Sequence, residues 1–155
     1  MIPSELEKAV AEHPFVRGMS ASHLGILNQC AMFTEFETGQ IVFREGEIAN
    51  RFYLVRRGKI SVESQTGSGE VIPVQTVGPG EVLGWSWLFA PYYWHFNGCA
   101  LEPTEAIFFY GTRLREKCEQ DTDFGYELMR RVVAILMQRL QSTVKESLRL
   151  AGGGK

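Results

Sequence analysis

The sequence predicts a mainly β domain, a double-stranded β-helix of the jelly-roll type, preceded by short helices and followed by one long helix. Helix-start patterns fill the first thirty residues, short β-prone runs with glycine turns fill the middle, and an apolar repeat of helical period fills the end. A chain of 155 residues suits one domain with its own core. The expected parts of this domain (1–150) are N-terminal helices over 1–31, the β-roll over 32–110 and C-terminal helices over 111–150, with a flexible tail over 151–155.

Two short helices are expected in the first thirty residues. Ser4 precedes the stretch "ELEKAVAE", and Glu7 follows three positions later, which is the pattern of a capping box. Ser20 stands in the same way before a second apolar stretch. Because Pro14 and Gly18 lie between the two stretches, we expect a break there.

Residues 32–110 are typical of an antiparallel barrel or jelly roll, because many short strands alternate with regular glycine turns. The β-prone runs are "MFTEFE", "QIVFRE", "RFYLVRR", "KISVESQ", "EVIPVQTV" and "AIFFY". Glycine is expected where a strand bends sharply or where the backbone needs a positive φ. The glycines at such places are Gly39, Gly46, Gly58, Gly78, Gly80 and Gly84.

The last part of the chain predicts a helix of six or more turns. Apolar residues recur every four positions from Phe124 to Leu148, and Asp121 and Asp123 place negative charge where the helix dipole favours it. The apolar stripe either packs on the chain's own β-roll or pairs with a second copy. We favour a homodimer through this helix, because the stripe is larger than a small barrel usually covers. The expected contact residues are Val132, Leu136, Leu140 and Val144.

Composition and charge argue against several classes of function. The three cysteines lie far apart without C-x-x-C spacing, and no apolar run reaches the roughly 20 residues that cross a bilayer, so a cytoplasmic protein without membrane association is expected. His95 is the one histidine of the β region, too few for a metal-dependent oxygenase. We therefore expect no metal, no cofactor and no catalysis. Direct DNA binding is not expected either, since the net charge is −2 and no basic stripe is present.

A series of short elements follows the order of a known family. A His/Pro/Phe start at residues 13–15 is followed by a leucine-bearing helix, Gly39 with Ile41, the Glu-Gly-Glu turn at 45–47, the strand 52–55 and Gly58. In this order the elements resemble the cyclic-nucleotide-binding domain family. The resemblance covers nearly the whole chain and implies an eight-stranded β-roll with N-terminal helices and a long C-terminal helix.

The resemblance also implies a phosphate-binding cassette, made of a glycine turn, a short helix, a glutamate for the ribose and an arginine for the cyclic phosphate. In this sequence "GEVLGWSWLF" supplies the turn at Gly84 and the short helix, but Trp85 stands where the family has glutamate. The segment 94–96, Trp-His-Phe, stands where an Arg-[Ser/Thr]-Ala element is expected. Because a buried anion without partners costs several kcal/mol, ordinary binding of cyclic AMP or cyclic GMP is not expected. Binding by backbone amides alone stays an alternative.

The cassette region is unusually aromatic and supplies the candidate ligand-pocket residues. These are Gly84, Trp85, Ser86, Trp87, Leu88, Trp94, His95, Phe96 and Asn97. The aromatic rings either fill the barrel mouth, line a pocket for an apolar or planar ligand, or contact another, unidentified protein. We favour filling, with Trp85 and Trp94 in the volume that ribose and phosphate would take. The predicted function is a non-enzymatic regulatory or interaction module; the alternative is a sensor that binds a cyclic nucleotide or an aromatic or apolar small molecule in the roll.

Overall fold

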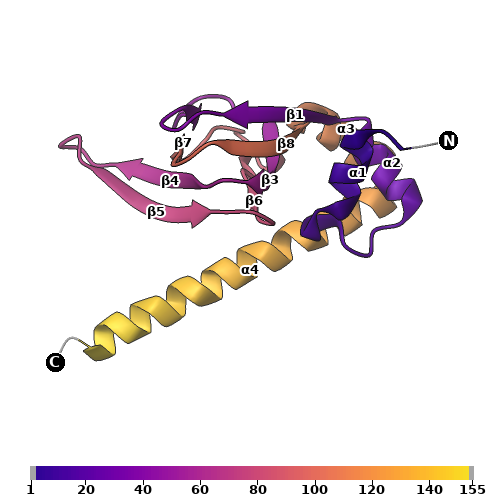
Figure 1. Ribbon diagram of the computed structural model, residues 1–155. Coiled ribbons are helices and arrows are strands. Elements are labelled where there is room, and N and C mark those ends of the chain that lie inside the picture. Colours follow the sequence, from indigo (N-terminus) through magenta and orange to yellow (C-terminus); the bar gives the residue numbers. More distant parts are fainter. Residues whose placement is uncertain (1–2, 154–155) are drawn as a thin grey trace. The chain divides into compact units, whose positions relative to one another are not determined.

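The computed structural model describes residues 3–153 of the chain. The chain divides into two compact units, Met1–Lys117 and Cys118–Lys155. The first unit holds the N-terminal helices, all eight strands and most of helix α3, and the second unit is dominated by helix α4 (Figure 1). The fold class is the one that the sequence predicts, two antiparallel sheets with flanking helices and a long C-terminal helix.

The N-terminal part contains helix α1 (Glu5–Glu12), the short 3-10 helix η1 (Pro14–Val16) and helix α2 (Ala21–Asn28). The Ser4 hydroxyl accepts a hydrogen bond from the Glu7 amide at 3.1 Å, as the capping-box pattern predicts. The Ser20 hydroxyl accepts in the same way from the His23 amide at 3.2 Å. The expected helix break between α1 and α2 is confirmed, and Gly18 there has a φ of +82°.

The β-roll consists of two four-stranded antiparallel sheets, in the orders β1-β8-β3-β6 and β2-β7-β4-β5 (Figure 1). The strands are β1 (Ala31–Phe36), β2 (Ile41–Phe43), β3 (Arg51–Arg57), β4 (Ile60–Gln65), β5 (Val71–Val77), β6 (Val82–Leu83), β7 (Asn97–Ala100) and β8 (Thr104–Tyr110). All six β-prone runs of the sequence form strands. The two strands that the runs did not include, β6 and β7, border the cassette and have only two and four residues.

Side chains of both sheets meet between them in one apolar core. Its buried residues are Phe36, Phe43, Ala49, Tyr53, Val55, Ile60, Val62, Val77, Leu83, Trp94, Ala100, Ala106 and Phe108. Because side chains alternate along a strand, Phe52 and Phe109 point to the opposite face of the first sheet. There the Phe15 ring of η1 meets the Phe52 ring edge-on, with 5.2 Å between centroids. The first sheet is therefore buried on both faces.

Two glycines are required where the chain passes close to another segment. Gly58 has a φ of +91°, and a Cβ there would lie 2.5 Å from the Pro103 carbonyl oxygen. Gly84 has a φ of +85°, and a Cβ there would lie 2.6 Å from Trp94 Cη2. Of the six glycines expected at a sharp bend or a positive φ, five have a positive φ, whereas Gly78 does not and lies between the end of β5 and the turn at 79–80.

Helix α3 (Gly111–Gln120) is followed by helix α4 (Thr122–Gly153), which begins where the Asp121 carboxylate accepts from the Phe124 amide at 3.1 Å. Along α4, Val132 is buried and Leu136 is half-buried, so neither lies on the fully exposed part of the helix. The exposed large hydrophobic residues of α4 are Tyr126, Met129, Val133, Met137, Leu140, Val144, Leu148 and Leu150. Helix α4 includes residues 151–153, which we expected in a tail, and residues 154–155 of that tail lie outside the described residues.

Candidate ligand-binding site

The cassette segment runs from β6 through Gly84 and the 3-10 helix η2 (Ser86–Leu88) to β7. The positive φ of Gly84 turns the chain out of β6, so the predicted glycine turn and short helix are both present. Helix η2 has a single turn, and no side chain caps its N-terminus. Of the resembled cassette, this segment therefore keeps the glycine turn and a single helical turn, and it does not have the glutamate or the arginine.

Trp94 lies inside the apolar core of the β-roll. Its side chain is 6% exposed, and its ring stacks on Phe43 with 4.0 Å between centroids and 13° between planes. The far edge of the indole touches the backbone at Gly84, where only glycine leaves room for it. An indole therefore occupies the space next to the cassette glycine.

The backbone around Trp94 is held by the turn that precedes β3. The Trp94 amide donates to the Glu47 carbonyl at 2.9 Å, and the Trp94 carbonyl accepts from the Gly46 amide at 2.8 Å. The Ala49 amide donates to the Tyr92 carbonyl at 2.7 Å. Both backbone groups of Trp94 are therefore satisfied, and they fix this part of the segment against the turn at 46–49.

The other two tryptophans lie in different environments. Trp87 is fully buried, but its ring faces Phe52, with 5.6 Å between centroids, on the outer face of the first sheet. Its buried indole Nε1–H has no hydrogen-bond acceptor. Trp85 is only half-buried and is not part of the core between the sheets. The expectation that Trp85 fills the roll together with Trp94 is therefore not supported by its position.

The remaining candidates are dispersed, and the aromatic run does not collapse into one cluster. His95 and Phe96 are exposed, and Ser86 and Leu88 are half-buried. The Asn97 side-chain oxygen accepts from the Glu45 amide at 2.8 Å, which gives it a structural role in the turn. Three further aromatic residues of the run are partly buried or exposed, namely Phe89, Tyr92 and Tyr93.

Arg115 of α3 contacts the cassette from outside the segment and was missed by the sequence reasoning. Its guanidinium donates to the Trp87 carbonyl and lies 4.1 Å from the centre of the Tyr92 ring. Tyr92 has a φ of +62°, a conformation that non-glycine residues rarely adopt. At the start of the same helix, a Cβ on Gly111 would lie 2.7 Å from Trp87 Cβ. Helix α3 and the cassette are therefore in direct contact.

Arg51 contacts the core from the first position of β3. Its guanidinium carbon lies 4.3 Å from the centre of the Phe108 ring. Burial raises the pKa of the Tyr53 hydroxyl, and the adjacent Arg51 guanidinium partly opposes this rise. The alternation of the run "RFYLVRR" places Arg51 on the same face as Tyr53, a signal that could have found it.

His13 connects the N-terminal helices to β3. Its Nε2 lies 3.0 Å from the Val55 carbonyl oxygen, and its Nδ1 accepts from the Phe15 amide at 3.1 Å. This arrangement requires the neutral ring with the proton on Nε2, since the carbonyl can only accept. Burial lowers the pKa of His13, and the nearby Arg56 charge lowers it further. His13 is thus a satisfied structural histidine.

Within residues 3–153, no group of three or more His, Cys, Asp and Glu side chains is arranged to hold a metal ion. Over the same part of the chain, no helix has the length and apolar character needed to cross a membrane.

Comparison with known protein families identifies the class of protein. The profile of the cyclic nucleotide-binding domain family matches residues 33–121, more than half of the chain. The chain belongs to this family. A comparison with curated protein sequences found no match.

Solved structures agree with the family assignment. A protein of Geobacter metallireducens GS-15 described as cyclic nucleotide-binding is 26% identical, with a TM-score of 0.77, over 90% of this chain and 99% of that chain. A cyclic nucleotide-binding domain from Methylobacillus flagellatus KT is 14% identical, with a TM-score of 0.77, over 93% and 81% of the two chains. The catabolite activator protein of Thermus thermophilus is 20% identical, with a TM-score of 0.71, over 89% and 63%. The last two likenesses show the fold alone.

Proposed function

We propose that this protein is a non-enzymatic regulatory module whose β-roll does not bind cyclic AMP or cyclic GMP in the way of its family. The single observation that carries the proposal is the position of Trp94, stacked on Phe43 and in contact with Gly84 inside the roll. A ligand that approached the cassette glycine from inside would have to displace this indole. The Trp94 side chain thus acts as a plug, that is, it fills the space that the resemblance gives to the nucleotide.

The chemistry of the segment supports the same proposal. Trp85 replaces the carboxylate that the resemblance places after the cassette glycine, and the segment 85–98 contains no lysine or arginine. A buried phosphate without a charged partner loses much of its hydration energy, and a single turn of 3-10 helix restores little of it. The segment itself therefore supplies neither the space nor the charge that the usual ligand needs, and the two guanidinium groups that reach this region, those of Arg51 and Arg115, come from β3 and α3.

Isothermal titration calorimetry with cyclic AMP and cyclic GMP tests this proposal. We expect no binding heat with either nucleotide at ligand concentrations up to about 100 times a micromolar Kd. Trp94→Ala, which empties the plug, and Phe89→Ala, which shortens an exposed side chain of the same segment, serve as a matched pair. Micromolar affinity of the wild-type protein for either nucleotide overturns the proposal.

We further propose that α4 mediates a homodimer. Leu140, Val144 and Leu148 lie along one side of the helix at intervals of four residues, and they are 63%, 48% and 67% exposed. Met137 extends the same surface and is 54% exposed. An apolar stripe of this length on a helix is stabilised when a second helix covers it.

Light scattering of variants that carry new negative charge on α4 tests the homodimer. Leu140→Glu with Val144→Glu is expected to give a folded monomer, because two carboxylates would face their copies across the interface. Gln138→Glu with Ser142→Glu adds the same charge on the opposite side of α4 and is expected to stay dimeric. A wild-type protein that is monomeric at high micromolar concentration contradicts the proposal.

A further inference from the structure

Arg51 is an arginine on the inner face of the β-roll without a carboxylate partner. The ion pairs found within residues 3–153 do not include it. Its contacts are the face of the Phe108 ring, at 4.3 Å, and the hydroxyl of Tyr53. A half-buried guanidinium that meets only an aromatic face and a phenol keeps most of its donors available for an anion.

The surroundings of Arg51 form one continuous patch on the first sheet. The strand register places Arg51 opposite Tyr110, and it places Phe108 between Tyr53 and Met32. Directly opposite residues in antiparallel strands point to the same face, so all five side chains share the inner surface. Tyr53 is 1% exposed, whereas Tyr110 is 36% and Met32 is 47% exposed. The patch is therefore closed at the core end and reaches solvent at the other.

The patch lies next to the cassette but differs from the resembled site in its source of charge. A Cβ on Gly84 would lie 3.3 Å from the Arg51 carbonyl oxygen, so the first residue of β3 borders the cassette glycine. In the resembled cassette the arginine follows the short helix, whereas here the positive charge comes from β3. A planar guanidinium next to an apolar, aromatic surface is suited to a carboxylate with an apolar body, because its fork pairs both carboxylate oxygens.

We propose that Arg51 binds the carboxylate of a small organic acid whose apolar or aromatic body lies against the exposed side chains of Tyr110 and Met32. The inference rests on the proposed function in one respect, since Trp94 fills the neighbouring space and leaves this patch to ligands smaller than a nucleotide. The ligand would then meet the inner face of the roll at its solvent-accessible end. Binding requires no change in the plug.

Titration with benzoate, followed by calorimetry and by NMR of the wild-type protein, tests the proposal. Benzoate is a planar carboxylate, and benzamide has the same shape without the charge. We expect saturable benzoate binding with a Kd on the order of 1 mM, as suits a probe of this size. Benzamide is expected to bind at least about tenfold more weakly, since a charge-assisted hydrogen bond is lost.

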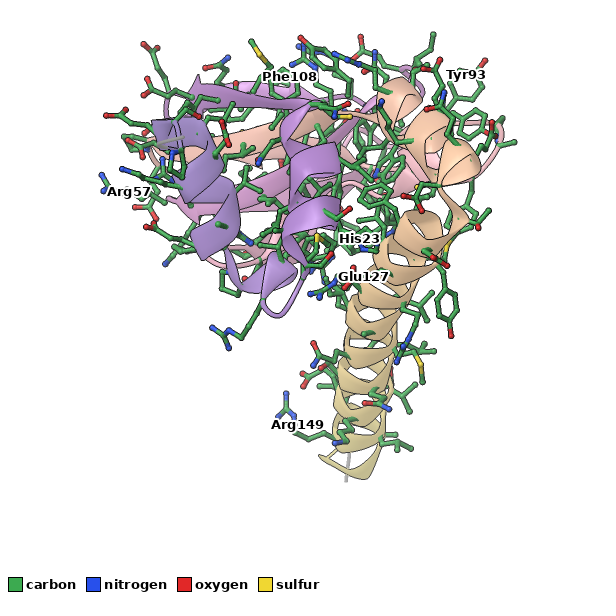
Figure 2. The ribbon with its side chains drawn as sticks, turned by 90° about the vertical axis from the view of Figure 1, so that its right-hand side faces the viewer. His23, Arg57, Tyr93, Phe108, Glu127 and Arg149 are labelled. Carbon is green, nitrogen blue, oxygen red and sulfur yellow. The ribbon has the colours of Figure 1, made fainter. Side chains whose placement is uncertain are left out.

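Two matched variants locate the charge. Arg51→Met keeps an apolar side chain at the position and is expected to weaken benzoate binding at least about tenfold. Arg57→Met makes the same change at the last residue of β3, where the side chain is 76% exposed, and is expected to leave binding unchanged within twofold. Figure 2 shows Arg57 on the opposite side of the roll from Tyr93 of the cassette segment.

Several results overturn the inference. These are equal binding of benzoate and benzamide, equal binding by wild type and Arg51→Met, and an absence of saturable benzoate binding up to about 10 times the expected Kd. If Arg51→Met does not fold, the side-chain Nε–H signals of the wild-type protein decide, because benzoate must shift that of Arg51 and not that of Arg57. Failure of the proposed function is measured separately, because micromolar binding of cyclic AMP would contradict it whether or not benzoate binds.

Discussion

Replacing Trp94 by alanine tests how much the buried indole contributes to the fold. The ring is 6% exposed, stacks on Phe43 at 4.0 Å and touches Gly84. A side chain of this size buries roughly 150–250 Å², which at about 25 cal/mol per Å² corresponds to about 4–6 kcal/mol, an upper bound because the unfolded chain is already partly compact. Large aromatic truncations in cores cost about 3–5 kcal/mol, so we expect Trp94→Ala to lose that amount.

The measurement is thermal and urea unfolding of the variant beside wild type. For a chain of this size, a loss of about 3–5 kcal/mol lowers Tm by roughly 6–20 °C. Phe89→Ala is the matched control, because this side chain is 53% exposed in the same segment and its loss should change Tm by no more than about 2 °C. If Trp94→Ala melts within a degree of wild type, the indole does not support the core, and the plug is the wrong description of it.

Three further predictions concern the contacts around the roll. Gly58→Ala should cost at least about 3 kcal/mol in urea unfolding, because its Cβ would collide with the Pro103 carbonyl at a φ of +91°, whereas Gly67→Ala, with nothing within 4 Å, should be nearly neutral. Burial lowers the pKa of His13 in the folded protein, so the histidine of the unfolded chain is protonated first as the pH is lowered. The stability that neutral His13 contributes should be complete above about pH 6.5 and should fall at lower pH. His13→Gln should flatten this dependence when unfolding is measured at several pH values. Equal pH slopes would contradict the assignment. Arg115→Met should cost about 1–2 kcal/mol after allowance for partial exposure and should speed hydrogen exchange in the cassette; unchanged exchange there would show that Arg115 does not hold the segment.

The fold could be predicted largely because its signals are local. The strand over 51–57 has the expected bounds, since the apolar run FYLV at 52–55 and its flanking arginines lie between an asparagine and a glycine. The cap at Ser4 was visible from residue types alone. Strands β6 and β7 were missed because two- and four-residue strands carry too few side chains to show a period.

The site could be predicted only in part, because burial depends on the direction in which each side chain points. Trp85, Trp87 and Trp94 are equally apolar in sequence, yet only Trp94 enters the core between the sheets. Arg51 and Arg115 reach the region from β3 and α3, at sequence distances that no local pattern connects. Composition identified the aromatic segment, whereas tertiary structure decides which of its rings take part.

The hydrogen bonds that hold Trp94 between Gly46 and Glu47 have a consequence for the apparent affinity of any ligand that needs the space of the indole. If opening the plug costs about 3–5 kcal/mol, as the truncation estimate suggests, the open form is present at roughly one molecule in a hundred to one in ten thousand. Apparent affinity falls by the same fraction, so an open roll with micromolar intrinsic affinity would show a Kd of roughly 0.1–10 mM. The indole would thus weaken any ligand that needs its space by about two to four orders of magnitude, in addition to the effect of the missing glutamate and arginine.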